Sequence, residues 1–373
     1  MNEIDLKSIT AIISSFVALL LALFILSVKS NNKISNRLFS VFLMLTAIEI
    51  SGFYLNFFVT ISHRINSVIN LLYYLLTPTF YLYVCSVCYS NFKLKWKHVL
   101  HLLPFIIGNI VMIPRFYFGE IEEVVALNQN IILTFELIFT HVTMHIQSLC
   151  YYIASFVVVK QAKNIFTENF SNNAIETYKW LYQIVLFWFA VFIIATIKNI
   201  FKYLGYKDVF LSSQVLLSVS LLIMVCWYVL KALRNPDLFR GVDSKIILTE
   251  KLIKTSKYSI TDEKVQKLKD YMIKNEPYLN PSLSIRSLAD EMKTPMRELS
   301  ILINQNLNKH FFDFVNEYRI KKAMNHLEDS SNDQLTILEI LYQVGFNSKS
   351  SFNTAFKKYT KLTPTQYRKS YKK

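Results

Sequence analysis

The chain has 373 residues, a formal net charge of +15, 53% hydrophobic residues and 18% charged residues. About 25% charged residues is usual in a soluble globular protein, so the composition argues against a single soluble domain. Collagen-like and disordered chains are excluded, because there are only 6 Gly and 8 Pro. Residues 1–231 hold 26 charged positions with net charge +6, whereas residues 232–373 hold 41 with net charge +9. The sequence therefore predicts a membrane region followed by a basic soluble region.

Seven stretches of the first region are apolar over about 20 residues, the length that crosses a bilayer as a helix. Pro104, Gly108 and Pro114 interrupt the fourth stretch, and membrane helices tolerate such breakers. The first stretch does not read as a cleaved signal peptide, since its leading segment is not basic and its apolar run is too long. We expect spans near residues 9–28, 38–61, 65–89, 98–118, 131–159, 180–203 and 209–230.

Basic residues predict the orientation of these spans, because Lys and Arg collect in cytoplasmic loops. With the N-terminus outside, the acidic run at 120–123 is also outside, and an odd number of spans places the soluble region in the cytoplasm. The expected location is thus a membrane with the soluble region on its cytoplasmic side, and the lipid bilayer is an expected partner. The inner loops would carry eleven basic residues, Lys29, Lys33, Arg37, Lys93, Lys95, Lys97, Lys160, Lys163, Lys179, Lys231 and Arg234, against five outer ones, Lys7, Arg64, Arg115, Lys202 and Lys207.

Ionisable side chains inside spans are costly and are functional candidates. Glu136 and Lys198 lie at similar depths in the fifth and sixth spans, which suggests an ion pair facing the bundle interior. The pair would belong either to a signal site or to the bundle's structure, unless Lys198 reaches outward to the interface. Glu49 lies in the middle of the second span without an assignable partner.

His141 and His145 lie four residues apart on the fifth span and therefore share one face. Zinc uses such pairs, but no third ligand follows at a matching spacing, so hydrogen bonds between helices are the favoured reading. No metal or cofactor is expected. The pair Cys85 and Cys88 is read as membrane packing rather than as a redox or metal site, because all the cysteines fall in the cytoplasmic halves of their spans.

The soluble region begins with a linker, residues 232–282, whose segment up to about 261 has no pattern. Within it, residues 262–275 form a short amphipathic helix with Val265, Leu268, Tyr271 and Met272 at helical spacing. We hypothesise that this helix couples the membrane region to the rest, by pairing two chains into a homodimer.

Residues 283–373 contain the same local pattern twice. In the first unit Ser284 caps one helix, and Thr294 with Pro295 begins a second that runs to about Gln305. In the second unit Thr336 and Glu339 form a capping box, Gly345 suits a left-handed helix end, and Ser348 caps the next helix. Thr363 and Gln366 begin a last helix. Two helices joined by a short turn, twice over, indicate tandem helix-turn-helix units.

A helix over residues 310–327 connects the two units and is apolar on more than one side, which predicts burial between them. Its 18 residues span about 27 Å, and successive major grooves on one side of DNA are about 34 Å apart. The two recognition helices could thus enter neighbouring grooves. No acidic residue follows Glu339, whereas eight basic residues do, which favours phosphate contacts over a solvated tail or a patch on the inner leaflet.

These residues resemble the tandem helix-turn-helix domain of AraC-type transcription regulators. The resemblance covers residues 283–369 and rests on SLADEM at 287–292, FFDFVNEYRIKKAMNHL at 311–327 and TILEILYQVGFNSKSSFNTAFKKYTKLTPTQYR at 336–368. It implies binding of double-stranded DNA and control of nearby promoters, with RNA polymerase as a partner. The chain is also similar to a Bacteroidetes-like subgroup that carries a polytopic membrane region before this domain.

Carried over by position, the resemblance implies a base-reading face on each unit. The family often has Arg where Ile301 and Thr354 stand, and a glycine where Lys293 stands; readout would then use Arg297, Asn353 and Lys349, or DNA shape. The implied DNA-binding residues are Arg297, Ser300, Ile301, Lys349, Ser350, Ser351, Asn353, Thr354, Lys357, Lys358 and Arg368.

The sequence as a whole predicts an all-α, membrane-embedded DNA-binding regulator that responds to an unknown small-molecule or membrane signal. It is not expected to be an enzyme, because no Walker loop, HExxH or GxSxG motif occurs. The alternatives are a membrane-tethered regulator without sensing and a transporter-like protein with a basic regulatory tail.

Overall fold

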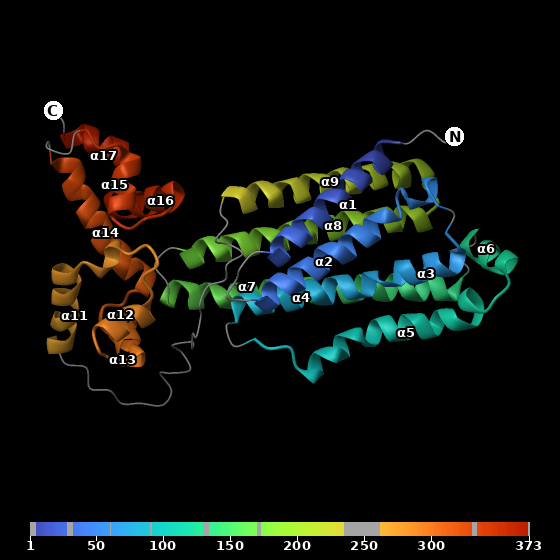
Figure 1. The fold of residues 1–373 in the computed structure, drawn as a ribbon, viewed down its shortest axis with the longest axis horizontal. Coiled ribbons are helices and arrows are strands. Elements are labelled where there is room, and N and C mark those ends of the chain that lie inside the picture. The colour runs from blue at the N-terminus through green and yellow to red at the C-terminus, as the bar shows by residue number, and fades with distance from the viewer. Residues whose placement is uncertain are drawn as a thin grey trace. The chain divides into compact units, whose positions relative to one another are not determined.

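The computed structural model describes residues 5–27, 33–59, 61–89, 92–129, 134–169, 173–234, 262–329 and 334–371. Every regular element among these residues is helical, which confirms the all-α class for this part of the chain (Figure 1). The chain divides into two compact units, residues 1–159 with 181–244 and residues 160–180 with 245–373. Residues 235–261 of the predicted linker lie outside the described residues, as do Lys29, Lys372 and Lys373, whereas 232–234 end the last helix of the bundle.

Seven helical segments of the first unit are long and apolar enough to cross a membrane, which matches the predicted number. In Figure 1 they lie lengthwise beside one another. The segments are Leu6–Ser27, Lys33–Ser51, His63–Cys88, Trp96–Tyr117, Phe135–Lys163, Tyr178–Tyr203 and Lys207–Lys231.

The first two helices are α1 (Leu6–Ser27) and α2 (Lys33–Ser51). The second span was predicted to continue to residue 61, and this boundary is wrong. The chain turns after Ser51 and forms a short 3-10 helix, η1 (Leu55–Phe57). At about 1.5 Å per residue, the 19 residues of α2 already cover most of a hydrocarbon core.

The third and fourth segments are interrupted. The third consists of α3 (His63–Leu71) and α4 (Tyr73–Cys88), which contains Pro78. In the fourth, Pro104 and Pro114 each stand in the first turn of a new helical segment, as expected for a residue without a backbone N–H. Its parts are the 3-10 helix η2 (Trp96–Leu102), α5 (Leu103–Met112) and the π-helical turn η3 (Ile113–Tyr117), and the short helix α6 (Ile121–Gln129), which the sequence pattern did not predict, follows.

Three long helices follow: α7 (Phe135–Asn169), α8 (Asn173–Tyr203) and α9 (Lys207–Arg234). Residues 160–180, the end of α7 and the start of α8, are grouped with the second unit. With 35, 31 and 28 residues, each is longer than its predicted span. The sequence pattern predicts only the apolar part of each helix, whereas the helix itself continues into the more polar residues on either side.

Small side chains allow α1 to approach its neighbours closely. Ala11, Ala18 and Ala22 are fully buried. Ser40 of α2 donates to the Ala22 carbonyl at 3.0 Å, and Ser15 donates to the Ala47 carbonyl at 3.4 Å. Small residues with interhelical hydrogen bonds are typical of helix packing in membranes.

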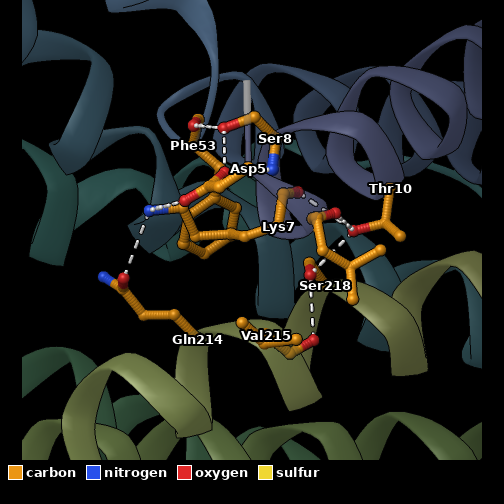
Figure 2. Close-up of polar contacts among 9 residues, drawn as sticks. Asp5, Lys7, Ser8, Thr10, Phe53, Gln214, Val215 and Ser218 are labelled. Atoms are coloured by element: carbon orange, nitrogen blue, oxygen red, sulfur yellow. Dashed lines mark hydrogen bonds and ion pairs between the residues drawn. The ribbon is translucent and has the colours of Figure 1, made fainter. Parts of the chain in front are cut away.

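A polar network closes one end of α1 (Figure 2). Thr10 donates to Ser218 of α9 at 2.9 Å, and Ser8 donates to the Phe53 carbonyl just beyond α2 at 3.0 Å. Ser8 also donates to Asp5, and this hydrogen bond holds the pKa of the Asp5 carboxyl below its ordinary value. The network ties α1 to both neighbours at the end predicted to face outside.

The second unit, as described from residue 262, forms two small cores joined by α14 (Phe311–Glu328) (Figure 1). The first core contains α11 (Asp262–Asn275), the 3-10 turn η6 (Pro277–Leu279), α12 (Ile285–Glu291), α13 (Met296–Ile301) and the π-helical turn η7 (Leu302–Asn306). The second contains α15 (Ile337–Gln343), α16 (Lys349–Thr360) and α17 (Pro364–Tyr371).

Most predicted helix starts of this unit are confirmed by hydrogen bonds. The side chains of Ser284, Thr336 and Ser348 accept from the backbone N–H groups three residues on, and Gln366 and Thr363 cap each other reciprocally. The predicted cap at Thr294 is wrong, because α13 begins one residue later and the Thr294 hydroxyl donates back to the Met292 carbonyl.

Candidate DNA-binding surface and the polar cluster of the bundle

The helix α14 belongs to both cores of the second unit. Phe311, Phe314 and Val315 in its first half pack with α12 and α13, whereas Ile320, Ala323 and Leu327 in its second half pack with α15 and α16. The prediction that this helix is buried between two units is therefore confirmed. A continuous helix through both cores fixes the two units on one support.

A buried arginine connects the two helix-turn-helix units where they meet. Arg319 of α14 is 0% exposed, and it donates from Nε to the Tyr278 carbonyl at 2.6 Å and from Nη2 to the Asn280 carbonyl at 2.8 Å. Its guanidinium also lies 5.5 Å from the centre of the Phe346 ring. Burial lowers the pKa of Arg319 to about 9. Arg319 lies within the 311–327 motif, and the family resemblance implied no role for it.

Gly345 lies at the same contact between the two helix-turn-helix units, and with Arg319 it forms the joint between them. It has a φ of +86°, as predicted for a left-handed helix end. A Cβ atom here would lie 2.5 Å from the Tyr278 carbonyl oxygen and 2.7 Å from that of Leu279. The turn after α15, in the second helix-turn-helix unit, thus packs directly against the backbone segment that Arg319 binds. The spacing of the two recognition helices is therefore set by close packing.

On α16 the predicted face is largely accessible. Phe352, Ala355 and Phe356 are buried in the core, so the opposite side of the helix faces out. Asn353 is half-buried and Ser351 is 7% exposed, with its backbone N–H used by the Ser348 cap. The exposed members of the predicted set on this helix are Lys349, Ser350, Thr354, Lys357 and Lys358.

Two of the predicted DNA-binding basic residues are less accessible to DNA because of their contacts or burial within the protein. Lys358 pairs with Asp313 of α14 at 2.5 Å, and its neighbour Tyr359 donates to the Asp313 carbonyl. Arg368 is half-buried, and its Nη2 atom has no hydrogen-bond partner among the described residues. Lys349 and Lys357 therefore remain the clearest phosphate-binding candidates on α16.

The first helix-turn-helix unit exposes fewer of its predicted DNA-binding residues than the second. Arg297 is half-buried, whereas Ser300 and Ile301 are only 2% and 5% exposed. The prediction that Ser300 and Ile301 read bases does not fit their burial in this structure. Lys293, which stands where the family often has glycine, adopts a left-handed φ of +51° in the turn before α13. The turn geometry is kept without the glycine.

The helix α11 belongs to the first core. Leu268 and Met272 are 0% exposed and pack with Leu283, Leu288 and Phe311. Lys264 also pairs with Glu298 of α13 at 2.6 Å. The predicted pairing of two chains through this apolar face is wrong, because the face is already covered within the chain.

In the bundle, the predicted pair of Glu136 with Lys198 is also wrong. Glu136 accepts from Arg115, at 2.7 Å from Nε and 2.5 Å from Nη2. Arg115 belongs to η3, whose turn brings its guanidinium to the start of α7. The sequence had placed Arg115 in an outer loop, and spacing alone gave no signal for this bidentate pair.

The remaining predicted residues gather around one cavity of about 250 Å³, lined by Glu49, His141, His145 and Lys198 among others. Glu49 is the charge partner of Lys198 across this space. His145 contacts Thr196 at 3.1 Å and Asn199 at 2.8 Å, and His141 contacts Tyr203. The predicted interhelical hydrogen bonds of both histidines are confirmed. No group of three metal-ligating side chains occurs among the described residues.

Comparison with known proteins gives matches confined to the second unit. Residues 288–370 match the family described as "Helix-turn-helix domain". An uncharacterized HTH-type transcriptional regulator of Staphylococcus aureus strain COL is 34% identical over 109 residues, which are 29% of this chain and 14% of the relative. The uncharacterized HTH-type transcriptional regulator YdeC of Bacillus subtilis is 30% identical over 87 residues, which are 23% of this chain and 29% of YdeC.

Among solved structures, the C-terminal domain of AraT, a response regulator from Geobacillus stearothermophilus, is 30% identical. The alignment covers 28% of this chain and 84% of that domain, with a TM-score of 0.25. The chain thus shares only 14% and 29% of the length of the two curated relatives. Residues 288–370 form a helix-turn-helix domain similar to those of HTH-type transcriptional regulators, as the AraC-type resemblance implied.

Proposed function

We propose that this chain is a membrane-embedded transcription regulator whose cytoplasmic unit binds double-stranded DNA through two helix-turn-helix units. The observation that carries the proposal is the joint at Arg319 and Gly345, which holds both units on α14 with fixed spacing. A helix of 18 residues is about 27 Å long, which suits two neighbouring major grooves on one face of DNA.

Charge supports the same assignment. Lys349, Lys357, Lys361 and Lys369 are exposed on α16, the turn after it and α17, and no acidic residue follows Glu339 in the chain. Cations on one side of a recognition helix attract the phosphate backbone and set the register of the protein on the duplex.

Embedding in a bacterial inner membrane is supported by the seven long apolar helices and by the alternation of basic residues between loops. The bundle is proposed to sense a signal and to pass it to the DNA-binding unit through α11, which packs rigidly on the first helix-turn-helix. RNA polymerase at the regulated promoter is the proposed further partner.

DNA binding can be measured on the intact chain in lipid nanodiscs and on a fragment of residues 262–373. The fragment begins with α11, because a start at residue 283 would remove Leu268 and Met272 from the core. We expect both proteins to select the same sites from a random duplex library, with a log–log salt slope of about −0.9 per phosphate contacted. Binding without sequence preference would contradict a regulator.

Orientation can be measured with single cysteines introduced in a chain whose four native cysteines are replaced. We expect Lys207→Cys to react with an impermeant maleimide in intact cells and Lys163→Cys to react only after lysis. The reverse pattern would contradict the proposed topology.

A further inference from the structure

We propose that the cavity of the helical bundle binds a small organic acid, whose carboxylate is held by Lys198 and Lys202 and whose body lies against apolar side chains. The inference rests on the proposed function, because it names the class of signal that such a regulator would sense. The residues that line the cavity come from α2, α3, α4, α5, α7 and α8, and all of them lie within one compact unit.

The size of the cavity limits the ligand. Its volume is about 250 Å³, below the range of about 300–1,000 Å³ that is usual for drug-sized ligands. Leu71, Met112, Leu137 and Met144 form the apolar part of its wall. These side chains suit a short aliphatic or aromatic body.

The charges of the wall do not balance. Lys198 and Lys202 lie four residues apart on α8 and thus on one face, and both line the cavity together with a single carboxylate, that of Glu49. The wall therefore carries two lysines against one carboxylate, and no ion pair within 4.0 Å joins Glu49 to either lysine among the described residues. The nearby Arg115 and Glu136 neutralise each other and do not line the cavity.

Among the described residues, neither half-buried lysine makes a hydrogen bond or an ion pair within 4.0 Å, and Glu49 acts on Lys198 only from farther across the cavity. A cation in an apolar helical bundle is costly unless it is paired. A carboxylate in the cavity would remove this cost, and the amide groups of Asn66 and Asn70 of α3 and Asn199 of α8, which also line the cavity, can donate further hydrogen bonds to it.

The two histidines position this wall. His145 contacts Thr196 and Asn199, and His141 contacts Tyr203, so the α7 face holds the α8 segment that carries both lysines. An anion that draws Lys198 away from Glu49 would change the contact between α2 and α8. Ligand binding would thereby change how these two helices pack in the bundle.

The test uses the full-length protein in nanodiscs without DNA, with acetate, butyrate and benzoate as probes and the matching neutral amides as controls. Binding is measured by equilibrium dialysis. We expect at least one acid to bind saturably below about 10 mM, the weak end of specific affinity, and its amide to bind at least about tenfold more weakly, because charge-assisted hydrogen bonds are lost.

The matched variants are Lys198→Gln and Lys202→Gln in the cavity and Lys207→Gln, an exposed lysine outside it. Each cavity variant should weaken binding of the acid about tenfold or more, whereas Lys207→Gln should leave it unchanged. Glu49→Gln removes the competing carboxylate and should tighten binding, which keeps the proposal testable if a lysine variant fails to fold.

The proposal is overturned if no acid binds saturably, if amides bind as well as acids, or if Lys207→Gln weakens binding as much as the cavity variants. Tighter binding by benzylamine than by benzoate would also overturn it. Because no DNA is present, failure here leaves the DNA-binding assignment intact, and loss of sequence-specific DNA binding in a protein that still binds the acid would overturn only the proposed function.

Discussion

The two compact units of this chain differ in whether their buried cations have hydrogen-bond partners. In the DNA-binding unit, Arg319 is fully buried and its guanidinium donates to two backbone carbonyls. In the bundle, Lys198 and Lys202 line a cavity and have no such partners among the described residues. A satisfied buried charge rigidifies the structure around it, whereas an unsatisfied one leaves a site for a ligand. The DNA-binding unit is thus held in one shape, whereas the bundle, under the proposal above, changes with the occupancy of its cavity.

The largest expected effect tests the rigid side of this comparison. Gly345→Val would place a side chain at positive φ against the carbonyls of Tyr278 and Leu279. Strain and overpacking together should lower the stability of the DNA-binding unit by about 2–6 kcal/mol. Thermal unfolding of residues 262–373 and binding to the selected site would measure it.

The control for that variant is Gly205→Val, which has a φ of +78° but no atom within 4 Å of the added Cβ. It carries only the conformational strain and should leave DNA binding of the full chain unchanged. Equal loss of DNA binding in both variants would show that close packing at the joint does not set the spacing of the two units.

The next effect concerns Arg319 itself. Arg319→Met keeps most of the side-chain volume but removes the arginine donor from the Tyr278 carbonyl, at a cost of about 1–3 kcal/mol for an unsatisfied group. The Asn280 carbonyl loses one donor and keeps the Leu283 N–H at 3.1 Å. Arg286→Met, on the exposed side of α12, is the matched control and should stay within about 0.5 kcal/mol of the parent. Denaturant unfolding of residues 262–373 measures both, and a similar loss in the two variants would contradict the role given to Arg319.

A smaller effect distinguishes DNA-contacting lysines from structural ones. Lys357→Ala should weaken binding to all duplexes and reduce the salt slope by about 0.9, if the side chain contacts one phosphate. Lys358→Ala instead breaks the pair with Asp313 and should lower stability without changing the slope. Salt titrations of DNA binding by the two variants measure this, and an equal change in slope would refute the distinction.

The smallest effect is a dependence on pH. Hydrogen bonds from Lys322 hold the pKa of the Glu276 carboxyl below its ordinary value of 4.5. The folded unit therefore binds fewer protons than the unfolded chain as pH falls through this range, so stability is present above the unfolded pKa and is lost as pH falls through the folded one. Glu276→Gln should make the unfolding midpoint of residues 262–373 less sensitive to acid. An unchanged acid dependence would show that other carboxyls account for it.

Sequence reasoning succeeded where the signal is local. The caps at Ser284, Thr336 and Ser348 and the left-handed end at Gly345 depend on residues a few positions apart, and a resemblance with specific motifs covered the same segment. The number of apolar helices followed from composition alone. In each case the interacting residues are close in the sequence or the property is a sum over one segment.

Sequence reasoning failed where the partner is distant. Arg115 reaches Glu136 only because η3 turns the chain, and Glu49 faces Lys198 from a helix far away in the sequence. The burial of Leu268 and Met272 likewise depends on which surface covers an amphipathic helix, and periodicity predicts the face without naming its cover. Ser300 and Ile301 are carried over by position from the family resemblance, and a position in a motif does not report that both side chains are buried in this structure.

The most direct test of the account maps the genomic sites that the full-length chain occupies in its own cells and footprints them. Two helix-turn-helix units held at fixed spacing on α14 predict protection of two major-groove segments about one helical turn apart on one face of the duplex. Gly345→Val should abolish both protections together. Protection of a single groove segment, or occupancy without a shared sequence, would contradict the claim that this chain reads DNA with two rigidly joined units.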